Sequence, residues 1–301
     1  MPDPERREVQ VQRARAKRTM QRFLTAQAHD LARQVRAKYP AMRARLGKAT
    51  QPDDIEDPED DDQADTFSPI DEAAASAAAD AFLDDLDWQS FETLPDEIFD
   101  PLERTYKGAR SAAVIQVGEV VDGLTPDEAR SAINFDVVNS AAVDWAEARA
   151  AEMVGMKRDA DGKLVPNPDA QWRIDETTRD AVRSLTTDAL LEGWKADDLA
   201  DAIIDDSAFG YDRALMIART EMRFANSNGT LDAWRDSGRV EKKEWSTSND
   251  EKVEEVCQAN QEAGALDLDE PFPSGDDAPP AHPNCRCVIV GTTYANDEDE
   301  S

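Results

Sequence analysis

The most informative stretch of the sequence is AHPNCRC, at residues 281–287, followed by the apolar run VIV at 288–290. It holds two of the three cysteines and one of the two histidines of the 301-residue chain within six residues. The β-branched residues after Cys287 are typical of a strand, and we expect one over 287–293. A second strand is expected over 240–247, around Trp245, with about 40 residues of short helix and Pro-rich loop between the two strands.

The segment before these strands is predicted to be a long helix. It runs from Tyr211 to Asp236, and Gly238 follows at the position where helices commonly end. Within it, Arg219 and Glu221 point in different directions, because helix residues two apart do not face each other. We expect a buried Arg–Glu pair here to tie the helix to the strands. The C-terminal part is therefore predicted to be a small α+β module in which a short sheet packs on a long helix.

Four segments in order carry a family resemblance: IARTE at 217–221, WSTSND at 245–250, VC at 256–257 and HPNCRC at 282–287. This series resembles the C-terminal domain of the phage Mu F-like minor head proteins, a family of head-morphogenesis proteins of tailed viruses. The resemblance covers roughly residues 170–292, and the residues before it share only a helical character with the family. One departure is Asn260, which stands where the family usually has the second cysteine of a C-x-x-C pair.

The resemblance implies a virion protein that acts in head morphogenesis. Family members associate with the portal and the capsid interior, so the implied partners are the portal protein and the major capsid protein. The implied location is inside the head near the portal vertex, and the host cytoplasm during assembly. The resemblance also implies that a set of residues is a structural hallmark: Arg219, Thr220, Glu221 and Trp245.

Composition narrows the function classes. The net charge is −31, which argues against a protein that coats DNA. The sequence contains no run of 18 apolar residues, so we expect no membrane-spanning helix. The acids are mostly Asp and the bases mostly Arg, a balance typical of proteins that stay hydrated at high salt. This favours a halophilic host, and a GC-rich genome combined with one acidic segment gives the same composition.

The charge is distributed unevenly along the chain. Residues 1–48 hold 13 Lys and Arg against 4 Asp and Glu, a net of +9, so the other 253 residues carry −31 − 9 = −40. Candidate partner-binding residues of this basic helix are Arg13, Arg15, Lys17, Arg18, Arg22, Arg33 and Arg36. Two interpretations stay open: docking on a protein partner, or contact with the phosphates of packaged DNA by a packaging or ejection protein.

The whole chain is predicted to be mainly α, with a long basic N-terminal helix, a helical middle and a short β-sheet near the C-terminus. We divide it into a basic helical arm (1–48), an acidic linker (49–72), a helical region (73–169), the minor-head-protein-like domain (170–293) and an acidic tail (294–301). Helices are expected over 4–39 (with an end or kink at Pro40), 71–92, 94–121, 126–156, 175–191 and from 195 to before Gly210, with a loop over 157–168.

The cysteine cluster is the main candidate site. Cys257, His282, Cys285 and Cys287 have the number and types of ligands for one tetrahedral zinc ion. Two cysteines two apart on a strand would hold their Cα atoms about 6.6 Å apart, so shared ligation needs a bend there. Zinc, a disulfide from Cys257 to Cys285 or Cys287, and packed reduced thiols all remain open, with no bound cofactor as the default expectation.

Catalytic motifs are missing from the sequence. It has no Gly-rich phosphate loop, no H-E-x-x-H and no G-x-S-x-G, and only two histidines could serve a nucleophilic cysteine. We therefore expect no enzymatic activity and assign no catalytic residue.

Overall fold

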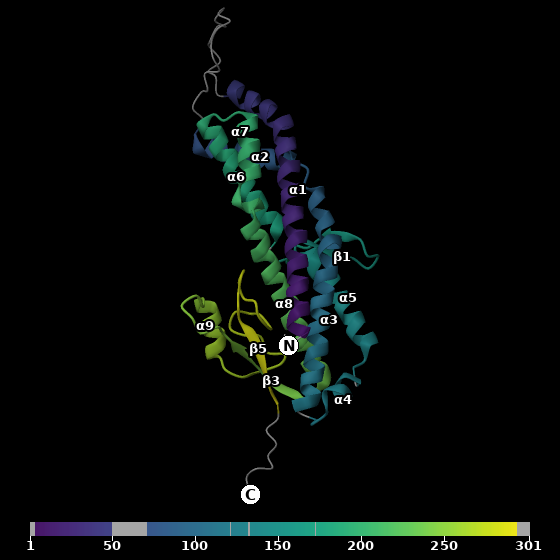
Figure 1. Cartoon of the computed structure of the whole chain (residues 1–301). Coiled ribbons are helices and arrows are strands. Elements are labelled where there is room, and N and C mark those ends of the chain that lie inside the picture. The colour runs from purple at the N-terminus through teal and green to yellow at the C-terminus, as the bar shows by residue number, and fades with distance from the viewer. Residues whose placement is uncertain (1–3, 50–70, 121, 132, 172, 294–301) are drawn as a thin grey trace, which may run out of the picture.

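The computed structural model describes residues 4–49, 71–120, 122–131, 133–171 and 173–293. Helices dominate, and the strands form two small antiparallel sheets (Figure 1). The helices are α1 Pro4–Ala49, α2 Glu72–Asp85, η1 Gln89–Thr93, α3 Leu94–Val120, α4 Pro126–Ser131, α5 Phe135–Glu152, α6 Ile174–Glu192, α7 Ala196–Asp205, η2 Ser207–Phe209, α8 Tyr211–Ser237 and α9 Glu255–Glu262. The strands are β1 Met156–Arg158, β2 Leu164–Pro166, β3 Val240–Ser246, β4 Leu266–Asp267 and β5 Val288–Thr293. The predicted class, mainly α with a small C-terminal α+β part, is confirmed.

The basic N-terminal helix lies within the main helical core. Its apolar stripe is almost fully buried, with Leu24, Leu31, Val35 and Tyr39 at 1 % exposure or less. These side chains share one core with residues from α3, α7 and α8. The segment at 1–48 is thus packed against the body, and its removal would open that core.

Pro40 does not end α1, which the sequence had led us to expect as one alternative. The helix continues to Ala49, and Figure 1 shows it bending toward its C-terminal end. An internal proline costs a helix about 3 kcal/mol, because it lacks the N–H donor and its ring crowds the preceding turn. Buried contacts on both sides of Pro40, including Tyr39 against Phe82 at 5.9 Å between ring centroids, offset that cost.

Helices α3 and α8 form the axis of the molecule and lie in close contact. A Cβ on Gly229 of α8 would lie 2.4 Å from the carbonyl oxygen of Tyr106, so only glycine allows this approach. Polar ties cross the same contact, because the Tyr106 hydroxyl donates to Asp232 and the Arg110 guanidinium donates to Asp236. The sequence-predicted limits of α3, α6 and α8 agree with the structure to within one or two residues, and Gly238 ends α8 with φ of 59°.

Two predicted helices are wrong in extent. The one expected over 71–92 ends at Asp85, and a 3-10 turn follows it. The one expected over 126–156 is split into α4 and α5, because the Asn134 side chain accepts hydrogen bonds from the backbone N–H groups of residues 136 and 137 and starts a new helix. The split shifts the buried face of α5 by one residue: Val138 is buried, whereas Val137, expected in the apolar stripe, is 49 % exposed.

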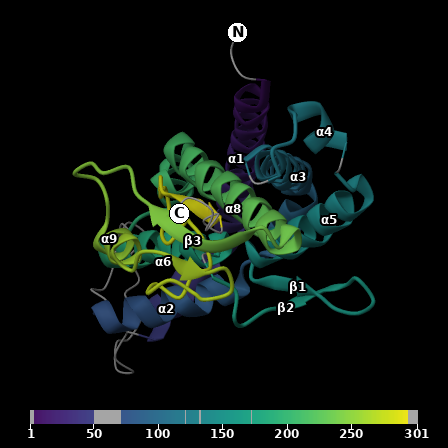
Figure 2. The ribbon, with the colours of Figure 1, turned by 90° about the horizontal axis from the view of Figure 1, so that it is seen from below.

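The loop expected over 157–168 contains an antiparallel hairpin. Strands β1 and β2 pair across a turn in which Gly162 has φ of 77°. The Asp159 carboxylate accepts hydrogen bonds from the backbone N–H groups of Asp161 and Lys163 and fixes this turn. Figure 2 shows the hairpin on the opposite side of the helical body from α9.

The C-terminal sheet has the order β4-β3-β5, with antiparallel pairing throughout. The two predicted strands are confirmed as β3 and β5, and the two-residue strand β4 was not predicted. Trp234 of α8 packs in one apolar cluster with Val240 and Ile289, so the sheet rests on the C-terminal half of α8. A separate small core surrounds Trp245 of β3 and the three cysteines.

The predicted domain boundaries stay predictions. Most of the acidic linker, at 50–70, and the tail, at 294–301, lie outside the described residues. Among the described helices, none combines the length and the apolar character that crossing a bilayer requires.

Candidate functional site

Helix α8, which contains the IARTE segment, directs Glu221 toward α5. Its carboxylate accepts two hydrogen bonds from Arg149, at 2.7 and 2.8 Å, and both side chains are 7 % exposed or less. Burial alone would lower the pKa of Arg149, but the charges and hydrogen bonds of Glu221 and Glu152 raise it above its ordinary value. We expected an Arg–Glu pair that tied α8 to the strands. That expectation is wrong, because the partner of Glu221 lies on α5.

Thr220 makes the contact between α8 and the cysteine loop. Its hydroxyl oxygen accepts a hydrogen bond of 2.8 Å from the backbone N–H of Asn284, and its proton is donated to the Met216 carbonyl. Asn284 has φ of 64°, a left-handed conformation that asparagine tolerates better than most residues. The consecutive residues 219–221 therefore have three different surroundings. Arg219 is exposed, Thr220 contacts the cysteine loop and Glu221 contacts α5.

Trp245 anchors the small core of the C-terminal module. Its side chain is 2 % exposed and packs edge-to-face on Phe272, with the ring centroids 5.1 Å apart. All three cysteines lie in the same cluster at 5 % exposure or less. The expectation that Trp245 is a core residue of the helix–strand module agrees with this burial.

The cysteines converge although they come from different elements. Cys257 belongs to α9 and its Sγ lies 3.7 Å from the Sγ of Cys285. One ligand atom each from Cys257, His282 and Cys285 lies within 4.8 Å of the other two. The Cys287 thiol is in hydrogen-bonding contact with both other thiols, although it is outside that mutually close set.

The predicted strand over 287–293 begins one residue later than expected. Strand β5 begins at Val288, so Cys285 and Cys287 lie before it in an irregular segment. The backbone turns at residues 283–284, where the Cys285 N–H donates to the His282 carbonyl at 3.2 Å. The geometric objection to shared ligation, which assumed an extended strand, therefore no longer applies.

Asn260 has a structural role at the position where the family usually has a cysteine. It is fully buried, its amide donates to the Ser274 hydroxyl at 2.9 Å, and its oxygen accepts from the Ser274 backbone N–H at 3.0 Å. Both polar ends of the side chain are therefore occupied. Asn260 fixes the Pro-rich loop and is not part of the thiol cluster.

Hydrogen bonds and burial shift the pKa values of the three cysteines in opposite directions. Hydrogen bonds from the Cys287 thiol and from the backbone N–H groups of Cys287 and Ala281 lower the pKa of Cys285 to about 5 against the effect of burial. Burial and the neighbouring Cys285 charge raise the pKa of Cys257 to about 12. The hydrogen bond given to Cys285 and burial likewise raise the pKa of Cys287.

Several of the predicted partner-binding residues of α1 interact with other side chains of the same chain. Arg36 pairs with Asp197 and Asp201, at 3.0 and 2.6 Å. Arg33 pairs with Asp30, and the Lys17 ammonium group donates a hydrogen bond of 2.6 Å to the Tyr211 hydroxyl. Arg15 lies 3.7 Å from Asp100. These pairs neutralise part of the positive charge of α1.

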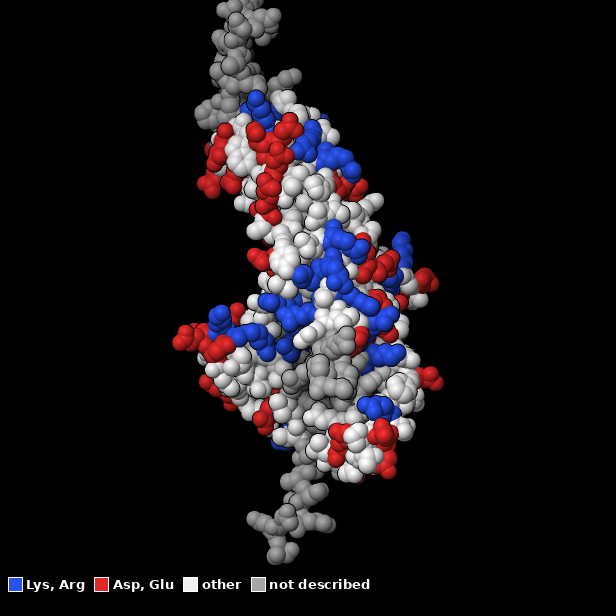
Figure 3. Space-filling view, in the orientation of Figure 1, with Lys and Arg blue, Asp and Glu red and all other residues white. Residues whose placement is uncertain are grey.

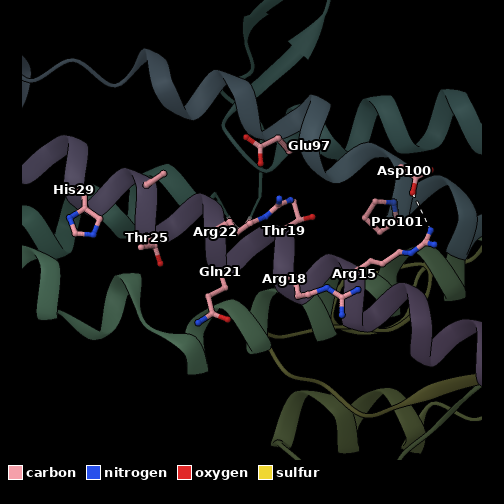
Figure 4. A pocket seen from close by; sticks show the side chains of 11 residues that line it. Arg15, Arg18, Thr19, Gln21, Arg22, Thr25, His29, Glu97, Asp100 and Pro101 are labelled. Carbon is pink, nitrogen blue, oxygen red and sulfur yellow. Dashed lines mark ion pairs between the residues drawn. The ribbon is translucent and has the colours of Figure 1, made fainter.

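A shallow hollow of about 820 Å³ runs along α1 where it faces α3. Arg15, Arg18 and Arg22 line one side together with His29, and Glu97 and Asp100 line the other (Figure 4). Because acids face the bases, this hollow is mixed in charge.

A second cleft, of about 500 Å³, is lined mainly by cationic side chains, and Cys285 also forms part of its wall. Five cationic side chains line it, from α1, α8 and the loops of the C-terminal module: Arg13, Arg219, Arg223, Lys252 and Arg286. No Asp or Glu is among its lining residues. We call it the arginine cleft. Figure 3 shows Lys and Arg gathered across the middle of this face of the molecule.

Three arginines of this cleft lack an intramolecular acid. Within the described ranges, Arg13, Arg219 and Arg223 form no ion pair, whereas Arg286 pairs with Asp250 at 2.5 Å. Burial lowers the pKa of Arg13, and the charges of Arg219 and Arg223 lower it further. Burial also lowers the pKa of Arg223. Arg18 and Arg22 of α1 likewise have no ion pair among the described residues, but acidic side chains line the hollow in which they lie.

The sequence signalled this cleft only in part. The spacing of Arg219 and Arg223 places both on one helix face, and Arg13 was among the candidate residues. That α1 lies beside the C-terminal module, and that Lys252 and Arg286 complete the cleft, depends on the tertiary fold.

The comparisons with known proteins agree with the signature residues. Residues 180–290 match a family model described as "Phage Mu protein F like protein". No curated protein and no solved structure matches the chain. The match covers the C-terminal part of the chain and is consistent with a C-terminal domain like that of the phage Mu F-like proteins, which suggests a phage head-morphogenesis protein.

Proposed function

We propose that this protein is a minor head protein of a tailed virus that binds the portal protein and the inner surface of the major capsid protein through the arginine cleft. The observation that carries the proposal is the set of unpaired arginines 13, 219 and 223 on an otherwise acidic chain. The Mu F-like domain supports a role in the phage head.

The physical argument rests on charge compensation. Arg13 and Arg223 are partly removed from water, and among the described residues neither forms an ion pair with a carboxylate. Their charges are therefore less screened than those of fully hydrated side chains. An acidic surface on a partner would supply the missing ion pairs, and arginine forms them with two parallel hydrogen bonds. The net charge of the chain is −31, so acidic surfaces elsewhere on the protein disfavour other orientations of the same acidic partner.

The proposal assigns binding and no turnover. The thiol with the lowered pKa, Cys285, is 5 % exposed, and the His282 ring nitrogen Nδ1 is already engaged by Pro283 and Glu254. A nucleophile needs a base and a route for substrate. These contacts favour a structural role for the cluster.

The test uses point variants in the complete protein, because α1 is part of the core. Arg13→Glu and Arg219→Glu change exposed residues of the cleft, and Arg33→Glu is the matched control on α1, with a side chain 78 % exposed. Co-purification with co-expressed portal protein is measured for each variant. We expect the cleft variants to lose at least about tenfold in portal binding, or about 1.4 kcal/mol, and the control to bind normally. Equal binding by all of them would refute the proposal.

A second candidate is contact with packaged DNA, which the same cleft favours because guanidinium groups also bind phosphates. If three phosphates were neutralised there, the logarithm of the affinity for duplex DNA would fall with a slope of about −2.7 against the logarithm of salt concentration. Filter binding of the intact protein at several salt concentrations measures that slope. Portal binding by a protein with no DNA affinity would favour the first candidate.

A further inference from the structure

We propose that Cys257, His282, Cys285 and Cys287 form a single tetrahedral zinc site that ties the Pro-rich loop and α9 to the start of β5. The ligands come from three places: α9, the turn at 282–284 and the segment just before β5. This inference concerns how the module is held together, and the site shares Cys285 and its neighbour Arg223 with the wall of the arginine cleft.

The separation of the sulfurs fits a shared metal ion. Two thiolates on one tetrahedral zinc, each about 2.3 Å from the ion, lie about 3.8 Å apart. The Cys257 and Cys285 sulfurs are 3.7 Å apart, whereas a disulfide would hold them at about 2.0 Å.

His282 is oriented as metal-binding histidines are. Its Nδ1 lies 3.0 Å from the Pro283 carbonyl oxygen and 3.2 Å from the Glu254 carboxylate. When the ring is neutral, these acceptors place its proton on Nδ1, which leaves on Nε2 the lone pair that a metal needs. A carboxylate that holds the far nitrogen of a ligating histidine is a recurrent second contact at zinc sites.

Cys287 is the fourth ligand, and Asn260 is excluded because Ser274 occupies both of its polar ends. The Cys287 thiol already contacts both other thiols. Its Sγ lies outside the mutually close set of the other three ligand atoms, so metal binding requires it to move toward them. The backbone N–H groups of Cys287 and Ala281, which hydrogen-bond to the Cys285 sulfur, fit a metal-bound thiolate.

Three thiolates, one imidazole and one zinc ion carry a net charge of −1, and the binding of zinc releases the thiol protons to solvent. Arg223 lies close enough to Cys285 and Cys287 to feel their charge, so a positive group stands beside the excess negative charge. Soft sulfur ligands with one imidazole select zinc over magnesium or calcium, which prefer oxygen.

The test measures metal in the intact protein, purified with a thiol reductant and without chelator. Elemental analysis is expected to give about one zinc per chain. Cys257→Ser and Cys285→Ser are expected to lose most of it, and His29→Asn, on α1, is the control that keeps it. Replacement of zinc by cobalt is expected to give thiolate-to-metal charge-transfer absorption and the visible bands of tetrahedral cobalt.

A second measurement covers variants that fail to fold. In the unaltered protein, the three thiols are expected to resist alkylation until a chelator is added and to react afterwards. Protein without zinc that takes up no cobalt with thiolate bands would overturn the proposal. A mass lower by two hydrogens, which shows a Cys257–Cys285 disulfide in place of the metal, would also overturn it.

Discussion

The buried ion pair between Arg149 and Glu221 allows a quantitative prediction for Glu221→Gln. The change keeps the shape of the side chain and removes its charge, which leaves the Arg149 guanidinium inside the core. Breaking a buried pair in this way costs roughly 3–5 kcal/mol. Glu152, 2.8 Å from Arg149 and 30 % exposed, supplies part of the compensation. We therefore expect a loss near the lower end, about 3 kcal/mol.

The double variant Arg149→Met/Glu221→Met separates the pair from its desolvation cost. Replacing both charges by apolar side chains of similar volume is often neutral or stabilising, so we expect the double variant to be at least as stable as the unaltered protein within about 1 kcal/mol. Glu262→Gln, at an exposed position of α9, is the control with the same chemical change.

Urea unfolding followed by tryptophan fluorescence gives the free energies, with the slope against urea as a check on the unfolded state. Equal stability of Glu221→Gln and Glu262→Gln would refute the reasoning, because it would mean that the pair is hydrated and not buried. A double variant less stable than Glu221→Gln alone would refute the desolvation argument.

Three further predictions follow from single side chains and from charge. Trp245→Ala should lower the free energy of unfolding by roughly 3–5 kcal/mol through the cavity left beside Phe272, and an unchanged melting temperature would contradict its burial. Burial raises the pKa of Tyr39 to about 12, so its contribution to stability is complete below about pH 10 and is lost as the pH rises from there through 12. Its hydroxyl is buried with no hydrogen-bond partner among the described residues. Tyr39→Phe should therefore keep full stability at neutral pH, and its free energy of unfolding should fall less than that of the unaltered protein as the pH rises above about 10. The net charge of −31 predicts that salt raises the melting temperature by screening repulsion, and a flat response would count against a halophilic host.

Local signals predicted the helices that have strong ends. Thr125 with Pro126 gave the start of α4, and the structure shows the capping box, since the Thr125 backbone N–H donates to the Glu128 carboxylate at 2.9 Å. Gly238 gave the end of α8. These signals act within one or two turns of the chain, which is why they can be recognised without the fold.

Features that depend on tertiary contacts were missed. The sequence suggested a partner for Glu221 on the strands, but Arg149 lies 72 positions away along the chain and only packing brings it there. Pro40 was expected to end or kink α1; the helix bends but continues to Ala49, because buried contacts around Pro40 outweigh its local cost. The arginine cleft likewise joins residues from both ends of the sequence.

The candidate metal site was predicted in its members and not in its geometry. The types and number of residues identified Cys257, His282, Cys285 and Cys287 as candidate ligands. An extended strand through Cys285 and Cys287 would have argued against their binding one metal ion together. The turn at 283–284 and the late start of β5 remove that objection. A proline followed by an asparagine marks such a turn, but its consequence for the sulfur positions needs the three-dimensional arrangement.

A cryo-EM map of the assembled portal vertex tests the central claim most directly. The account predicts this protein inside the head, beside the portal, with Arg13, Arg219 and Arg223 against acidic side chains of the portal protein or the inner capsid surface. A map that shows the protein outside the head, or inside it with the arginine cleft facing solvent, would contradict the account.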